Sequence, residues 1–275
     1  MPVLVESLGQ RIDREACIRW LARDPIHHLM LLGDLYPPLI SVSEIYVATN
    51  EGGIVGVGSL FRGFSIPSVI ITEDNPTVQI ALLTRMSRRF ESEWITISTC
   101  TSSSVFCQFG KRIYSHTELQ MLLHEPIPTP VKPARLIQRG EFDLLNQFYS
   151  EHRVEAWTPL MFEMGPFYGV WRDGQLIAAA GVHFVTPFIA QIGNVFSHPR
   201  FRGRGYATAA TAGVTNHLRR MGIQIISLFV VAENATAIRI YERQGFVKER
   251  ELIYAHNVST GSLRNETFSA VSPNH

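Results

Sequence analysis

Hydrophobic residues between positions 206 and 221 recur at steps of three and four, which places them on one face of a helix. The members of this face are Ala207, Ala210, Val214, Leu218 and Met221. Arg219 and Arg220 lie in the last turn, where cations interact favourably with the helix dipole, and Gly222 suits the turn that ends many helices. The pattern predicts a helix from Tyr206 to Met221.

Apolar and β-branched residues then run almost without interruption from Ile225 to Val231. Such a run is typical of a strand that helices cover on both faces of a sheet. A second short helix is predicted from about Ala235 to Arg243, before Gly245, and a last strand from Phe246 to Ala255. The residues after Val258 are polar and form a predicted tail.

The two halves of the chain repeat one pattern. Each has a strand, a glycine-containing turn and a second strand, then a third strand, a helical stretch and a fourth strand. In order, these segments are 45–53, 54–58, 68–72 and 94–99 in the first half, and 168–174, 176–181, 189–196 and 225–231 in the second. We interpret this as two related domains of the α/β (α+β) class, each with a mixed twisted sheet flanked by helices. The alternative is that any two α/β domains share such a pattern.

Prolines set the boundary between these domains. The segment 126–133 contains four of them, and proline resists both helix and central strand. We predict an N-terminal domain at 1–126, a linker at 127–133, a C-terminal domain at 134–258 and a polar tail at 259–275.

Charge and composition exclude several classes of partner. The formal net charge is +1, so no overall field attracts nucleic acid or an anionic membrane. The longest apolar runs, such as 176–185, are too short to cross a bilayer, and the N-terminus carries no secretion signal. The three cysteines form no C-x-x-C pair, which favours buried thiols in a reducing cytoplasm and predicts no metal site.

Candidate chemistry lies in the segment 194–208, where a strand ends, a loop rich in glycine and arginine follows, and a helix begins. The first turn of a helix leaves N–H groups unpaired, so this loop predicts an anion site suited to a diphosphate. A P-loop is excluded because Gly-Lys-Ser/Thr is absent. A dinucleotide loop fails at Thr208, where the third glycine is required. Nucleic-acid binding through Phe201 and the arginines is not favoured, because the basic cluster is short.

The chain resembles the GNAT superfamily of N-acetyltransferases. Residues 202–207, Arg-Gly-Arg-Gly-Tyr-Ala, fit the superfamily's phosphate loop Q/R-x-x-G-x-G/A. Residues 234–246 fit its helix motif N-x-x-A-x-x-x-Y-x-x-x-G-F. The close match covers about residues 190–250 and the general pattern begins near Lys132. The arrangement of a degenerate first domain and a full second domain is also similar to the glycine N-acyltransferase-like branch.

This resemblance implies direct transfer of an acyl group from acetyl-CoA, or another acyl-CoA, to an amine of a small molecule or peptide in a ternary complex. It implies that two parallel strands part and that the pantetheine arm lies in the gap. The cofactor-binding residues that it implies are Val195, Phe196, Ser197, Arg202, Gly203, Arg204, Gly205, Tyr206, Ala207, Thr208, Asn234 and Tyr241. A non-catalytic module that binds or senses acyl-CoA is the alternative.

The same resemblance assigns catalytic roles. Tyr241 matches the general acid that protonates the departing thiolate. Gln191 stands where some relatives have a glutamate base, and a glutamine cannot take a proton. His183 on the preceding strand is a candidate base, with a structural histidine as the alternative, and Glu163 and Glu155 are weaker candidates.

Two further expectations concern the acceptor and the first domain. The residues Trp157, Met161, Phe162, Met164, Phe167 and Tyr168 border the acceptor pocket in the family, although core packing explains them equally well. Residues 72–77 of the first domain carry two acids and no glycine, which would repel a diphosphate. We therefore predict that the first domain binds no coenzyme and shapes the acceptor pocket or a homodimer surface.

Overall fold

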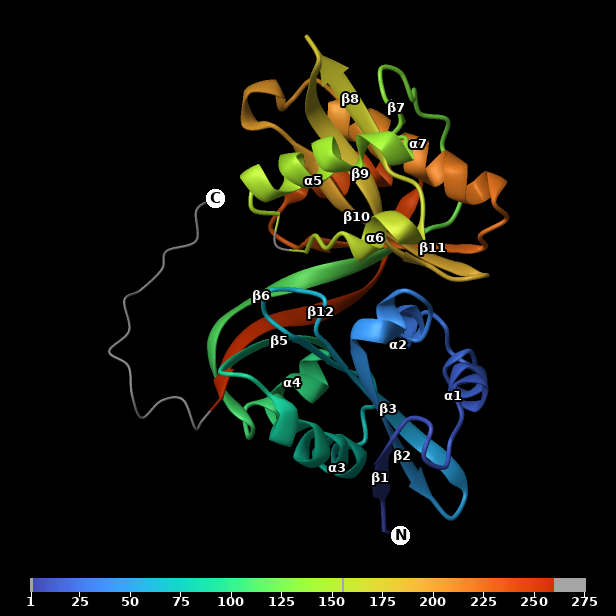
Figure 1. Ribbon diagram of the computed structural model, residues 1–275, viewed down its shortest axis with the longest axis vertical. Coiled ribbons are helices and arrows are strands. Elements are labelled where there is room, and N and C mark those ends of the chain that lie inside the picture. Colours follow the sequence, from blue (N-terminus) through green and yellow to red (C-terminus); the bar gives the residue numbers. More distant parts are fainter. Residues whose placement is uncertain (1, 155, 260–275) are drawn as a thin grey trace.

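A computed structural model describes residues 2–154 and 156–259 of the chain, without the side chains of residues 100–102. Glu155 and residues 260–275 of the predicted tail lie outside the described residues. The chain forms two lobes joined by a pair of long strands (Figure 1). No helix in these described ranges is long and apolar enough to cross a membrane.

Residues 4–123 form the first lobe, which contains both strands and helices. Its elements are β1 (Leu4–Ser7), α1 (Arg14–Leu21), α2 (Leu29–Asp34), η1 (Leu39–Val42), β2 (Ser43–Asn50), β3 (Gly53–Phe61), β4 (Ser68–Ile71), α3 (Pro76–Met86), η2 (Ser87–Arg89), β5 (Glu93–Ser98), α4 (Cys100–Phe106) and β6 (Gly110–Leu123).

The second lobe repeats this order. Its elements are β7 (Arg135–Leu136), η3 (Arg139–Glu141), α5 (Phe142–Glu151), α6 (Leu160–Met164), β8 (Tyr168–Arg172), β9 (Gln175–Val185), β10 (Ile189–Ser197), η4 (Pro199–Phe201), α7 (Tyr206–Arg220), β11 (Ile225–Val231), α8 (Ala235–Glu242) and β12 (Phe246–Ser259). The predicted strand at 225–231 has its predicted bounds. The predicted last strand was too short, because β12 continues beyond Ala255 to pair with the first lobe.

The described strands form one 12-stranded sheet in which the lobes exchange their long strands. Residues 253–258 of β12 pair with β5, and residues 118–122 of β6 pair with β11. The two long strands also pair with each other along their length (Figure 1). Each lobe therefore completes its sheet with a strand that the other half of the sequence supplies. The boundary at residues 127–133 stays a prediction.

Helix α2 of the first lobe packs against the second lobe. A Cβ atom at Gly33 would lie 2.5 Å from the ring of Phe184 on β9, so only glycine allows this close approach. Phe184 and Ile189 belong to the same buried cluster as Leu29, Leu31 and other residues of α1 and α2. The lobes thus share part of their hydrophobic core, and α2 covers the second lobe's sheet.

The predicted burial of the cysteines is only partly right. Cys17 is fully buried, and burial raises the pKa of its thiol to about 12, which keeps it unreactive. Cys107, by contrast, is exposed at the end of α4. Neither forms a disulfide with another described residue.

The carboxyl group of Asp34 links stability to pH. It is buried at the end of α2, accepts a 2.6 Å hydrogen bond from the Ser59 hydroxyl, and burial raises its pKa to about 7. An ordinary carboxyl ionises at a lower pH, so the unfolded chain binds fewer protons between about pH 4 and pH 7. The free energy of unfolding should therefore fall as pH rises through this window, by on the order of 4 kcal/mol.

Asp34→Asn should remove this fall and stabilise the protein at pH 8, as measured by urea unfolding across the pH range. Asp173→Asn is the control, because the Asp173 side chain is 94% exposed. Equal pH profiles for Asp34→Asn and the unmodified protein would show that the Asp34 carboxyl has an ordinary pKa.

Candidate active site

Strands β10 and β11 part from each other. They pair in parallel from Ile189 and Ile225 as far as Ile192 and Leu228. Beyond that point β10 continues to Ser197 and β11 to Val231 without pairing with each other. Phe196 and Ser197 pair with β9 only, so the edge of β10 that faces the gap has no strand partner there. The Ser197 carbonyl accepts a 3.4 Å hydrogen bond from Arg202 Nε.

An irregularity in β10 marks the start of this gap. The register with β9 shifts between Gly193 and Phe196, and Asn194 has a φ of 53°, which is uncommon for a residue with a side chain. The Tyr149 hydroxyl donates a 2.6 Å hydrogen bond to the Asn194 carbonyl. This buried contact holds the bend that redirects the end of β10.

The glycine-rich loop follows the end of β10 and leads into α7. Gly203 and Gly205 have φ values of 74° and 76°, in the left-handed region that favours glycine, and Gly205 is the N-cap of α7. The amides of the first turn, residues 206–208, have no partner within the helix. Arg202 and Arg204 are exposed beside them and form no ion pair with a described residue. The loop therefore presents amide donors and positive charge, as an anion requires.

Helix α8 supplies the residues of the second motif. Asn234 is its N-cap, and its side-chain oxygen accepts a 3.0 Å hydrogen bond from the Ala237 amide. Tyr241 is 7% exposed, and burial raises its pKa to about 12. The phenol thus keeps its proton at neutral pH and is available as a donor.

His183 lies against β10 at the bend. A Cβ atom at Gly193 would be 2.2 Å from His183 Nε2, so the imidazole covers this glycine. Burial lowers the pKa of His183 to about 4, which keeps the ring neutral at pH 7. Its Nε2 atom is buried and has no hydrogen-bond partner among the described residues.

Gln191 is the other residue at the predicted position of a base. It is fully buried, and neither atom of its side-chain amide has a partner within the described ranges. Ser227 lies opposite Gln191 where β10 and β11 pair, and it is also fully buried. Its hydroxyl has no hydrogen-bond partner among the described residues. The sequence analysis missed Ser227, whose only signal was a polar residue inside an apolar run.

Residues 137–246 match the acetyltransferase (GNAT) family. This part of the chain matches a GNAT acetyltransferase domain. The matched residues include the parted strands, the loop before α7 and the Tyr241 helix.

Curated relatives match part of the chain. It is 32% identical over 109 residues to the mycothiol acetyltransferase of Streptomyces coelicolor, which covers 38% of this chain and 33% of that protein. It is 38% identical over 65 residues to an uncharacterized N-acetyltransferase of Methanocaldococcus jannaschii, which covers 24% of this chain and 28% of that protein. The chain thus spans about a third or less of the length of these relatives.

Solved structures extend the likeness in fold to both lobes. A tandem GNAT protein from the clavulanic acid biosynthesis pathway has a TM-score of 0.60 at 14% identity, covering 93% of this chain and 98% of that one. A GCN5-related N-acetyltransferase from Sphaerobacter thermophilus has a TM-score of 0.58 at 15% identity, covering 94% and 96%. The predicted fold class, with GNAT-like sheets flanked by helices, is confirmed.

Several residues expected near the acceptor are in the core of the GNAT domain. Met161, Phe167 and Tyr168 are all less than 9% exposed. Trp157 packs on Tyr149 and donates a 3.0 Å hydrogen bond to Asn146. Trp157, Phe162 and Tyr149 all contact the ring of Phe167, so packing accounts for these aromatic residues directly. Glu163 is exposed on α6.

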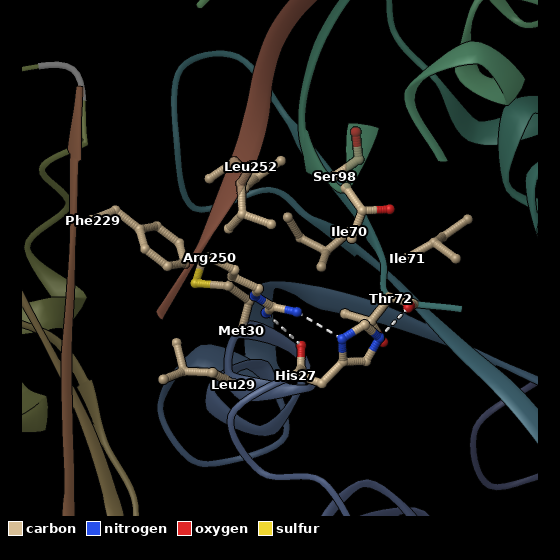
Figure 2. A pocket seen from close by; sticks show the side chains of 12 residues that line it. His27, Leu29, Met30, Ile70, Ile71, Thr72, Ser98, Phe229, Arg250 and Leu252 are labelled. Atoms are coloured by element: carbon tan, nitrogen blue, oxygen red, sulfur yellow. Dashed lines mark hydrogen bonds between the residues drawn. The ribbon is translucent and has the colours of Figure 1, made fainter. Parts of the chain in front are cut away.

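The first lobe has a corresponding gap that its own side chains occupy. Strands β4 and β5 pair only at Ser68 and Val69, with Ile95 and Thr96. Beyond this pairing, His27 Nε2 donates to the carbonyl of Thr72 (Figure 2). The cavity that remains measures about 20 Å³, room for about one water molecule.

Arg250 of β12 holds this arrangement in place. Its guanidinium group donates to His27 Nδ1 at 2.6 Å and to the His27 carbonyl at 3.1 Å (Figure 2). It also donates to the side-chain oxygen of Gln120 at 2.5 Å. The sequence analysis missed Arg250, because the contact joins residues that are 223 positions apart.

Proposed function

We propose that this protein transfers an acetyl or other acyl group from acyl-CoA to a primary amine of a small molecule or peptide, in a ternary complex. The observation that carries the proposal is the edge of β10 that faces the gap without a strand partner and leads directly to the amides at the start of α7. An edge of this kind suits a ligand with amide groups, and the adjoining helix start suits a linked diphosphate. Coenzyme A has these two parts in that order.

The described residues fit this ligand. The backbone groups of Val195, Phe196 and Ser197 would pair with the pantetheine arm, and the amides of residues 203–208 would hold the pyrophosphate. Space around the loop glycines is open, because a Cβ atom at Gly203 or Gly205 would meet nothing within 4 Å. Asn234, which caps α8, would contact the arm through its side-chain amide group. The bound coenzyme would supply an acyl group activated as a thioester.

Two side chains would move protons. Tyr241 is the proposed general acid, because its buried phenol keeps its proton at neutral pH and can give it to the departing sulfur. His183 is the proposed base, because its neutral ring leaves Nε2 unpaired among the described residues. The tautomer that acts as a base carries its proton on Nδ1.

The first lobe is proposed to bind no coenzyme. The Thr72 carbonyl, at the end of β4, already accepts a hydrogen bond from His27. The cavity beside it holds about one water molecule, which leaves no room for a pantetheine arm. Its proposed role is to cover the catalytic lobe's sheet through α2 and shape the acceptor side.

The second candidate function is an acyl-CoA-binding module without catalysis. Gln191 favours it, because a glutamine at that position cannot take a proton. Incubation with acetyl-CoA or longer acyl-CoAs and a panel of amino acids, polyamines, amino sugars and peptide N-termini separates the two. Acylated amine detected by mass spectrometry supports the enzyme, whereas coenzyme binding without any product supports the module.

Arg202→Glu should weaken the binding of acetyl-CoA by about 10-fold or more, because it replaces a cation beside the pyrophosphate with an anion. Calorimetric titration measures this affinity. Arg139→Glu makes the same charge change on the exposed η3 and should leave the affinity unchanged. Equal weakening in both variants would show that the effect is one of net charge and not of the loop.

A further inference from the structure

Two histidines and an arginine gather around one aromatic ring where the coenzyme gap opens. The ring of His152 stacks on Phe196 with 4.9 Å between centroids, and the Arg202 guanidinium lies 5.8 Å from the centre of the same ring. His198 meets His152 edge to face at 5.1 Å. We call His152, Phe196, His198 and Arg202 the mouth cluster. It joins the end of α5 to the end of β10 and the start of the glycine-rich loop.

The two histidines differ in their capacity to gain a proton. His198 Nδ1 accepts a 3.2 Å hydrogen bond from the Arg200 amide, so its neutral ring carries a proton on Nε2. A second proton on Nδ1 would break this cap of η4. His152 makes no hydrogen bond through its ring with any residue in the described ranges, so either ring nitrogen is able to take a proton without such a loss.

The charges around His152 hold it neutral until an anion arrives. Burial, then His198 and Arg202, lower the pKa of His152, and Glu151 on the same helix opposes them. Phe148 and Phe196 supply the apolar contacts. An anion beside Arg202 would reverse this balance, because it favours the charged form of a neighbouring imidazole.

We propose that His152 is a proton-dependent phosphate ligand at the mouth of the coenzyme gap, which gains a proton as the coenzyme's pyrophosphate binds beside Arg202. This inference rests on the proposed function of the site. His198 contributes an N–H donor through Nε2, because its Nδ1 accepts from the Arg200 amide. Affinity for the coenzyme therefore rises as pH falls, since the bound state holds one more proton than the free state.

The test measures binding of 3′-dephospho-coenzyme A by calorimetry between about pH 8 and pH 5.5. This probe retains the pyrophosphate but lacks the 3′-phosphate, which would itself titrate near pH 6. The expected result is an affinity about 3- to 10-fold higher at the acidic end. Proton uptake on binding, seen as heats that depend on the buffer, is expected near neutral pH.

Matched variants and a second probe test whether His152 causes the pH dependence of binding. His152→Phe keeps an aromatic ring on Phe196 and should abolish the pH dependence, whereas His198→Asn keeps a cap acceptor and should weaken binding equally at every pH. His256→Gln removes a remote histidine and should change nothing. S-acetylpantetheine, which has no phosphate, should bind without pH dependence.

Three results would overturn the inference while leaving the proposed function intact. They are a pH-independent affinity in the unmodified protein, a pH dependence that persists in His152→Phe, and the same dependence with S-acetylpantetheine. Failure of every coenzyme form to bind at any pH would instead remove the proposed function, and the inference with it.

Discussion

Tyr241→Phe should lower the turnover number by about 10- to 1000-fold while leaving the affinity for acetyl-CoA nearly unchanged. The change removes one hydroxyl from a buried ring that packs on Phe246, and the helix around it is retained. Loss of a proton donor to the departing sulfur acts on the chemical step rather than on coenzyme binding. Steady-state kinetics with an accepted amine, together with calorimetry, measures the two quantities separately.

Tyr114→Phe is the matched control, because Tyr114 is 47% exposed on β6 and lies outside the proposed site. It should leave both quantities unchanged. An unaltered turnover number in Tyr241→Phe would remove Tyr241 from the mechanism. A large loss of coenzyme affinity with normal turnover at saturation would make it a binding residue instead.

Gly245→Ala should destabilise the fold by about 3 kcal/mol or more. The residue has a φ of 93°, and a Cβ atom there would lie 1.8 Å from the carbonyl oxygen of Glu125. That oxygen belongs to the backbone, so relief requires the chain itself to move. The same stretch of backbone forms hydrogen bonds from the His124 amide to Gly245 and from the Ile127 amide to Gln244.

Gly174→Ala is the control that separates the cost of the positive φ from the cost of the contact with Glu125. Gly174 has a φ of 79°, but a Cβ atom there meets nothing within 4 Å, so only the backbone conformation opposes the change. It should cost about 1 kcal/mol. Urea unfolding of both variants measures the difference, and equal losses would show that the contact with Glu125 relaxes freely.

Local signals in the sequence predicted the elements that surround the candidate site. The helix at 206–220 begins and ends beside left-handed glycines, and the strand at 225–231 lies within one apolar run. Such elements are fixed by residues within a few positions of each other, so their pattern is visible without a structure. The family motifs lie in this same stretch.

Contacts between distant residues could not be predicted in this way. The predicted last strand ended at Ala255, and the pairing of residues 256–258 with β5, which is distant in sequence, extends it. Arg250 and His27 carry no motif, although together they occupy the first lobe's gap. The acceptor-side aromatics fitted two interpretations, and their packing on Phe167 is visible only in the structure.

The exchanged strands make the two lobes inseparable. A fragment cut at the proline-rich connector would lose β6 from between β11 and β12, and its partner fragment would lose β12 from between β5 and β6. Each fragment would then have two strand edges inside its sheet whose backbone N–H and C=O groups lack partners. Such edges promote aggregation. Recombination and protein engineering can therefore replace the second lobe only together with a first lobe that fits it.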